Sequence, residues 1–229
     1  MSPLAARIVS VLIGYVFGLF LTGEIVAKMQ NVDLRKHGSG NVGTTNSLRI
    51  LGVPSGVLTL VGDLGKTVLA MVLVWLIFRN QFPEIPNFYR LLKLYAGIGA
   101  VLGHDFPVYA KFKGGKGVAS SAGLLAAFSL PMFGITAVLF FGTVIISRYV
   151  SLGSIIGMSS LIIQAIVFGI SGSQTFMFLP EGGGYRIEGI AICVIVGVLG
   201  VVKHHSNIKR LVSGTENKFS FKNAGKKDA

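Results

Sequence analysis

The fold is decided by the stretch FKGGKGVASSAGLLAAFSLPMFGITAVLFFGTVII, residues 112–146. It opens with lysines and glycines between apolar segments. From Gly117 to Ile146, about 30 apolar or small residues follow, interrupted by Ser129-Leu130-Pro131. One straight membrane span needs about 20 residues, so this run is too long for one span and too short for two. It predicts two short helices that dip into a membrane and return.

The composition of the chain is that of an integral membrane protein. Its 229 residues are 52% hydrophobic and 13% charged, with a mean hydropathy of +0.70, whereas soluble domains carry about 25% charged residues. The net charge of +12 does not indicate nucleic acid as a partner, because apolar spans separate the basic residues and no stacking aromatics are interleaved with them. The single Cys193 excludes a disulfide within these residues.

Apolar runs of span length lie on both sides of the opening stretch. We expect full spans at about Leu4–Ala27, Ser55–Phe78, Tyr89–Gly103, Leu152–Phe176 and Ile187–Val202. With the two short helices they predict an all-α integral membrane protein of seven helices, five full and two short. Residues 1–216 are expected to form a single membrane-embedded domain, and residues 217–229 a basic, disordered cytoplasmic tail.

The distribution of Lys and Arg predicts the orientation. The loops at 28–49, 111–116 and 203–229 hold four, three and seven basic residues, which is fourteen of the 21 in the chain. The positive-inside rule places these three loops in the cytoplasm and the N-terminus outside. This arrangement needs an odd number of full spans, as five spans and a re-entrant pair provide.

The first of these loops is rich in hydrogen-bond donors. Hydroxyl and amide groups lie among glycines, and an arginine that can grip phosphate through two parallel hydrogen bonds closes the loop. The same residue types also cap turns and helix starts, so the loop alone leaves both interpretations open. The candidate residues are Ser39, Asn41, Thr45, Asn46 and Arg49.

The second and third loops carry further candidates. Glycines let backbone amides converge on an anion, and neighbouring lysines supply charge, although such a run is also typical of a flexible cytoplasmic loop. On a continuous helix, an imidazole and a carboxamide three residues apart share one face, although a basic helix here also suits anionic lipid. These candidates are His104, Lys113, Gly114, Gly115, Lys116 and Gly117 in the second loop, and His204 and Asn207 in the third.

Two other features have simpler interpretations. Asp63 and Lys66, three residues apart within an expected span, predict an intramembrane ion pair or a support for the neighbouring polar loops. The four histidines lack the carboxylate or thiol partners of a metal site, so we expect neither metal nor cofactor.

The polar loops together resemble the bacterial membrane acyl-phosphate:glycerol-3-phosphate acyltransferase family, PlsY. The resemblance covers nearly the whole chain to Glu216 and is specific, since three motifs occur in order on one predicted side. They are Gly38-Ser39-Gly40-Asn41-x-Gly43-x-Thr45-Asn46-x-x-Arg49; Gly103-His104-x-Phe106-Pro107 with Phe112-Lys113-Gly114-Gly115-Lys116-Gly117-Val118-Ala119; and His204-x-x-Asn207-Ile208-x-Arg210-Leu211 with Gly214-Thr215-Glu216.

The resemblance implies an activity and a location. The activity is transfer of a fatty acyl group from acyl phosphate to the 1-hydroxyl of glycerol 3-phosphate, giving lysophosphatidic acid and phosphate without an acyl-enzyme, as the first step of bacterial phospholipid synthesis. The location is the bacterial cytoplasmic (inner) membrane, with the site facing the cytoplasm. The catalytic residues would be His204, Asn207, Ser39 and Arg49, and the other candidates would bind substrate.

Two questions stay open from the residues alone. One is whether His204 or the departing phosphate takes the hydroxyl proton. The other is whether the protein is instead a small organophosphate or anion transporter, because broken helices and glycine-rich loops also build transport sites. The absence of an inverted repeat and the gathering of the basic motifs on one side favour the enzyme.

Overall fold

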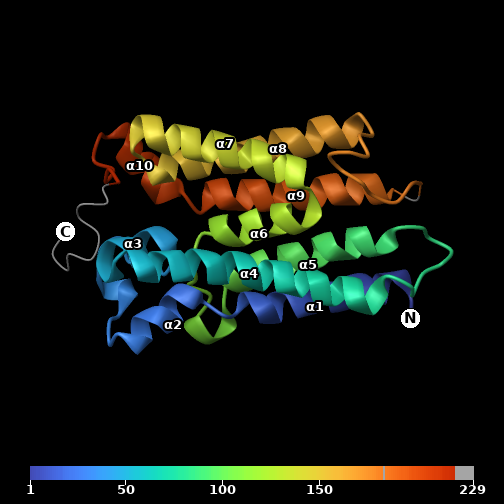
Figure 1. Ribbon diagram of the computed structural model, residues 1–229, viewed down its shortest axis with the longest axis horizontal. Coiled ribbons are helices and arrows are strands. Elements are labelled where there is room, and N and C mark those ends of the chain that lie inside the picture. The colour runs from blue at the N-terminus through green and yellow to red at the C-terminus, as the bar shows by residue number, and fades with distance from the viewer. Residues whose placement is uncertain (183, 220–229) are drawn as a thin grey trace.

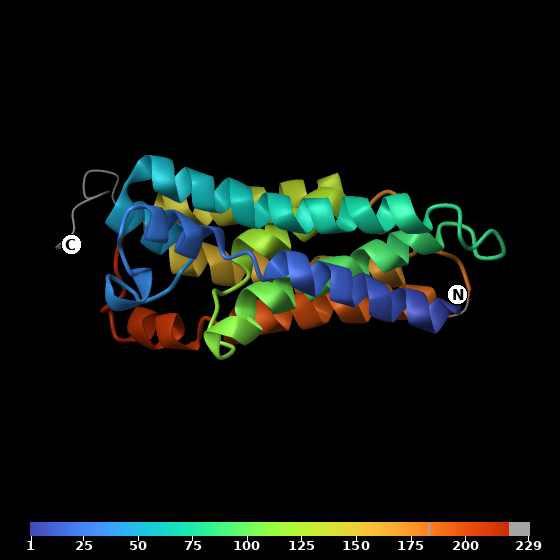
Figure 2. The ribbon, with the colours of Figure 1, turned by 90° about the horizontal axis from the view of Figure 1, so that it is seen from below.

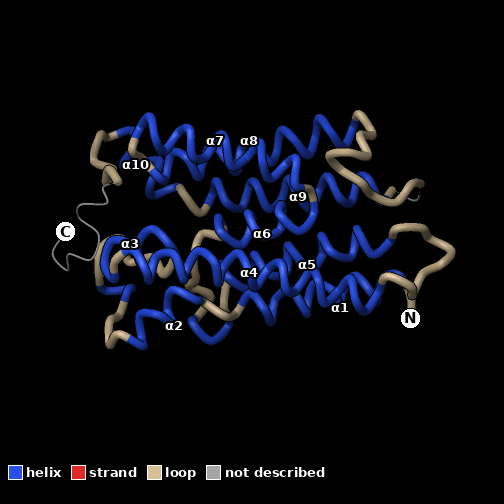
Figure 3. The backbone as a smooth tube through the Cα atoms, viewed as in Figure 1, coloured by secondary structure: helices blue, strands red, loops and turns tan. Residues whose placement is uncertain are grey.

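The computed structural model describes residues 1–182 and 184–219, and this part of the chain is helical without any strand (Figure 3). The helices are α1 (Pro3–Gly18), α2 (Thr22–Met29), η1 (Leu34–Lys36), α3 (Thr44–Leu51), α4 (Val53–Phe78), α5 (Phe88–Asp105), η2 (Val108–Ala110), α6 (Val118–Phe128), α7 (Leu130–Ser147), α8 (Val150–Ile170), α9 (Tyr185–Val202) and α10 (His205–Val212), where η marks a 3₁₀ turn.

The long helices run side by side along one axis (Figures 1 and 2). The N-terminus lies at one end, and α3 and α10 lie at the other, called here the α3–α10 end. Among the described residues, five segments are long and apolar enough to cross a membrane: Pro3–Met29, Val53–Phe78, Leu130–Ser147, Val150–Ile170 and Tyr185–Val202. The all-α membrane architecture is therefore confirmed.

The expected count of seven helices is wrong. The described residues contain ten α-helices, or nine when α1 and α2 are taken together as the apolar segment Pro3–Met29. The polar loops account for the excess, because residues 44–51 and 205–212 form the short helices α3 and α10. Both helices are polar, so a count based on apolar runs did not include them.

Only the first helix of the expected re-entrant pair is short. At 1.5 Å per residue, the eleven residues of α6 reach only about 16 Å, while the eighteen of α7 reach about 27 Å, nearly the thickness of the hydrocarbon. The second helix is thus not short. The division falls at Ser129, whose hydroxyl accepts from the Met132 amide at 3.4 Å, followed by Pro131 in the first turn of α7.

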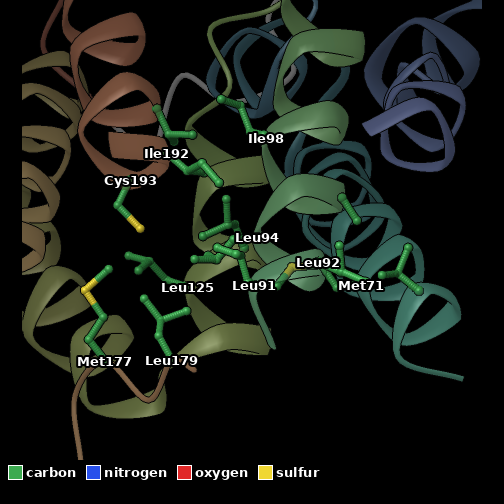
Figure 4. Packing of buried hydrophobic residues seen from close by; sticks show 14 of the residues in the cluster. Met71, Leu91, Leu92, Leu94, Ile98, Leu125, Met177, Leu179, Ile192 and Cys193 are labelled. Atoms are coloured by element: carbon green, nitrogen blue, oxygen red, sulfur yellow. The ribbon is translucent and has the colours of Figure 1, made fainter. Parts of the chain in front are cut away.

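The third expected span, α5, forms the centre of the molecule. It packs against α1, α4, α6 and α9, and thirteen of its eighteen residues are buried. Small residues let α1 and α5 approach closely: a Cβ on Gly14 would overlap the Ala96 carbonyl, and one on Gly103 would overlap that of Tyr15. Leu91, Leu94 and their neighbours fill the core between this helix and α9 (Figure 4).

The segment after α10 turns back along the α3–α10 end. The amide of Phe219 donates to the carbonyl of Arg148 at 2.7 Å, and the Lys218 ammonium lies 5.8 Å from the Tyr149 ring centroid. The first residues of the expected disordered tail therefore have defined contacts with the α7–α8 turn. Residues 220–229 of that prediction lie outside the described part of the chain.

Candidate functional site

Two contacts join the three basic loops at the α3–α10 end. A guanidinium nitrogen of Arg35, in the first loop, donates to the carbonyl of Lys113 at 2.7 Å. The ammonium of Lys116 donates to the carboxamide oxygen of Asn207, in the first turn of α10 in the third loop. Residues 78 and 91 positions apart in sequence thus meet around the Gly-Lys loop, residues 111–117.

The third loop is held by one carboxylate. Helix α9 ends at Val202, and α10 follows with His204 as its N-cap. Glu216 accepts from the Asn207 carboxamide nitrogen at 3.0 Å and from Arg210 Nε at 2.8 Å. With Lys116 on its oxygen and Glu216 on its nitrogen, Asn207 has a fixed orientation, which the sequence did not reveal.

Burial lowers the pKa of two groups at this junction. Loss of solvent and the positive charge of Arg210 together lower the pKa of Lys116 to about 8, against an opposing effect of Glu216. Burial also lowers the pKa of His204 to about 4, although the carbonyl of Gly200, 2.7 Å from Nδ1, opposes the shift. At neutral pH the imidazole is therefore uncharged and the ammonium is mostly charged. The hydrogen bond to Gly200 places a proton on Nδ1, which leaves Nε2 as an acceptor.

The glycines of the second loop pack against the end of α5. The amide of Gly114 donates to the Asp105 carbonyl at 3.1 Å, and the amide of Gly115 donates to the His104 carbonyl at 3.0 Å. Both donors are already used, so in this conformation they do not form the expected phosphate cradle. A Cβ on either glycine would overlap His104, which gives these positions a packing reason to be glycine. Gly117 has φ +68° and begins α6.

His104 lies beneath the loop rather than on its surface. Only 3% of the residue is exposed, and its Nδ1 is 2.8 Å from the Lys66 ammonium. Lys66 also pairs with Asp63 at 2.9 Å, which confirms the intramembrane ion pair expected from the sequence. The structure thus places His104 as a support of the loop.

In the first loop, one side chain holds the loop backbone through hydrogen bonds, whereas the other candidate side chains have no partner in the described part of the chain. Asn46 is buried, accepts from the Ser39 amide at 3.0 Å and donates to the carbonyls of Leu34 and His37. Arg49, on α3, has no ion pair or side-chain hydrogen bond within the described part of the chain. The same holds there for the side chains of Ser39, Asn41, Thr45 and Lys113.

Three functional features were missed by the sequence reasoning. Arg35 bonds both Lys113 and Glu24, the latter at 2.9 Å, and so ties α2 to the Gly-Lys loop. Lys203 donates to the Asp105 carbonyl at 3.1 Å. Glu216 was quoted within a motif without a role. The sequence could have indicated a role for Glu216, because it is the only acidic residue in the basic 203–219 segment.

The arrangement suits an anionic ligand. Lys113, Lys116 and Arg49 present positive charge among hydroxyl and carboxamide donors, and His204 offers a neutral nitrogen. Among residues 1–182 and 184–219, no cluster of three or more histidine, cysteine or acidic side chains could hold a metal ion. Fold and site together define a multi-pass α-helical membrane protein with three basic loops at one end of its bundle.

The chain belongs to the glycerol-3-phosphate acyltransferase family, whose model matches residues 8–214. A protein of that name from Halalkalibacterium halodurans is 38% identical over 214 residues, covering 90% of this chain and 95% of the relative. One from Shouchella clausii is 35% identical over 225 residues, covering 96% of this chain and 100% of the relative.

Solved structures of PlsY, an integral membrane glycerol 3-phosphate acyltransferase, share the fold. Its glycerol 3-phosphate form superposes with a TM-score of 0.73 at 30% identity, covering 96% of each chain. Its lysophosphatidic acid form gives 0.74 at 29% identity, covering 95% of this chain and 97% of the other. These relatives confirm the resemblance seen in the motifs.

Proposed function

We propose that this protein transfers a fatty acyl group from acyl phosphate to the 1-hydroxyl of glycerol 3-phosphate, giving lysophosphatidic acid and phosphate. The observation that carries the proposal is the meeting of Lys116, Asn207 and His204 at the α3–α10 end of a membrane bundle. Family membership supplies the reaction class, and the positive charge of the three loops suits a reaction whose two substrates each carry a phosphate.

On this proposal, different basic residues bind the phosphates of the two substrates. Arg49, which has no partner in the described part of the chain, would hold the phosphate of glycerol 3-phosphate through two parallel hydrogen bonds. Ser39 and one of Lys113 and Lys116 would complete that contact. The second lysine then faces the phosphate of the donor, while Asn46 keeps the first loop in shape.

The chemical step is a direct acyl transfer. The hydroxyl oxygen attacks the acyl carbon, the ester bond forms, and the bond from that carbon to the phosphate oxygen breaks with its electron pair leaving on phosphate. Because the pKa of His204 is about 4, its imidazole is a weak base at neutral pH. The departing phosphate therefore accepts the proton, while His204 and Asn207 orient the hydroxyl and the positive charges stabilise the transition state.

The charge distribution supports a cytoplasmic site in the bacterial cytoplasmic membrane. The loops that build the site carry fourteen of the 21 Lys and Arg residues, as the positive-inside rule requires of the cytoplasmic side. The lysophosphatidic acid formed there enters the surrounding lipid. On this proposal the protein performs the first step of phospholipid synthesis.

A donor comparison tests the proposal. Purified protein in detergent is given labelled glycerol 3-phosphate with either acyl phosphate or acyl-CoA, and lysophosphatidic acid is measured. We expect product from acyl phosphate alone. Product from acyl-CoA would refute the donor assignment, and no product from either, together with glycerol 3-phosphate uptake by proteoliposomes, would establish a transporter.

A pair of arginine variants tests the phosphate contact. Arg49→Lys keeps the charge but loses the two-pronged grip, so kcat/KM should fall at least about tenfold. Arg79→Lys is the matched control, because Arg79 lies at the far end of α4 over the Trp75 ring, 4.8 Å from its centroid. Equal kinetics for both variants would contradict the role of Arg49.

A further inference from the structure

The apolar segment Pro3–Met29 is broken where α1 ends and α2 begins. Lys66 donates to the carbonyls of Gly18 and Phe20 at 3.2 and 2.8 Å. The hydroxyl of Tyr109 donates to the carbonyl of Leu19 at 2.8 Å, and the amide of Thr22 donates to Asp63 at 3.3 Å. Side chains from α4 and from η2 therefore satisfy the backbone groups that the break exposes.

These partners make the break possible within a membrane. Backbone groups outside a helix need hydrogen bonds there, because hydrocarbon supplies none. Lys66 and Asp63 are 6% and 1% exposed, so lipid and water do not replace their contacts. The α1–α2 break is a fixed feature that depends on the ion pair of α4.

The same ammonium contacts the residue that lies beneath the Gly-Lys loop. It lies 2.8 Å from His104 Nδ1, and since an ammonium only donates, Nδ1 accepts and the ring proton is on Nε2. The other side of the ring is covered by Gly115, where a Cβ would overlap Nε2. Gly115 is bonded through its amide to the His104 carbonyl. One atom of Lys66 therefore contacts both the break and the residue on which the loop rests.

We propose that Lys66 is a positioning residue for the acyl transfer. By holding the His104 ring against the α1–α2 break, it fixes the backbone of Gly114 and Gly115 and so sets where Lys113 and Lys116 present their charges. The role rests on the proposed function, but its structural half, the order of the Gly-Lys loop, can be measured without turnover.

Lys93 provides a matched control within the same bundle. Lys93 is a half-buried lysine that, like the buried Lys66, donates to a backbone carbonyl, here that of Ala127 at 2.7 Å, at the end of α6 away from the loop. A general need for buried lysines predicts equal effects at both positions. A positioning role predicts an effect on the loop from Lys66 alone.

The experiment compares Lys66→Met with Lys93→Met in the full chain. Hydrogen exchange of the peptide covering residues 108–118 reports the amides of Gly114 and Gly115, and steady-state kinetics with acyl phosphate report KM for glycerol 3-phosphate. For Lys66→Met we expect exchange about tenfold faster and KM raised about tenfold, with a smaller change in kcat. Lys66→Arg should restore part of both, since it keeps the donors. Lys93→Met should leave both at the wild-type value.

Removing one member of a buried ion pair leaves the other charge unpaired. The double variant Asp63→Asn/Lys66→Met is therefore made as well. This double variant lacks the anchor without an unpaired charge, so its expected exchange and KM match those of Lys66→Met. Wild-type exchange and KM in the folded double variant would overturn the proposal, as would an equal KM shift in Lys93→Met. If wild-type protein fails to use acyl phosphate, the proposed function fails, while the exchange comparison still decides the role of Lys66.

Discussion

Raising the pH through 8 should remove the positive charge of Lys116 and with it part of the attraction for a phosphate. Burial, with a further contribution from Arg210, lowers the pKa of this lysine from its ordinary value to about 8. The negative charge of Glu216, which accepts from the Asn207 carboxamide, raises this pKa but does not offset the effect of burial. The lysine is thus charged below that pH and neutral above it.

The size of the effect follows from the titration. With a pKa of about 8, about nine-tenths of the protein carries the charge at about pH 7 and about one-tenth at about pH 9. Because kcat/KM reports the free enzyme, it should fall about tenfold across that interval. Glycerol 3-phosphate does not contribute to the change, since a phosphate monoester loses its second proton near a pKa of about 6.

The assay measures kcat/KM for glycerol 3-phosphate at constant ionic strength. Lys116→Arg is the control, because a guanidinium does not titrate in this range and keeps the charge. Its profile should remain flat where that of the wild type falls. A flat wild-type profile, or the same midpoint in Lys116→Arg, would refute the assignment of the charge to Lys116.

Three other predictions concern single residues. If His204 titrates at about 4, wild type and His204→Gln share one profile shape between about pH 5.5 and about 7, where only the substrate phosphate titrates; a midpoint near 6.5 in wild type alone would restore the general base. Gly115→Ala should lower kcat/KM at least about tenfold because its Cβ overlaps the ring beneath it, whereas Gly134→Ala, with open space around it, should not. Glu188→Gln should destabilise the protein by about 1.5–3 kcal/mol, because it weakens the paired hydrogen bonds from Arg7 at 2.7 and 2.8 Å. A lower melting temperature with an unchanged kcat would show this effect.

The sequence predicted those parts of the fold that depend on hydrophobicity and charge. Span length located α4, α5, α8 and α9, and the spacing of Asp63 and Lys66 indicated their ion pair. The distribution of basic residues predicted that the three loops lie at one end of the bundle, where Lys116 contacts Asn207. Each of these properties is carried by a short stretch of chain.

The features that were missed depend on distant residues. Leu19, Phe20 and Leu21 are apolar, so nothing in that stretch marks the α1–α2 break, which Lys66 and Tyr109 stabilise from elsewhere in the chain. Likewise, glycine permits both an anion cradle and close packing. Only the position of His104 decides in favour of packing at Gly115.

The ion pair of α4 also affects how the protein enters the membrane. Asp63 and Lys66 lie near the middle of a 26-residue apolar helix, and on insertion scales two such charges oppose entry by about 5–7 kcal/mol. Their partners come from α1, α2 and α5, of which α5 is synthesised after α4. The ion network of α4 is therefore complete only after α5 has been synthesised and lies beside it.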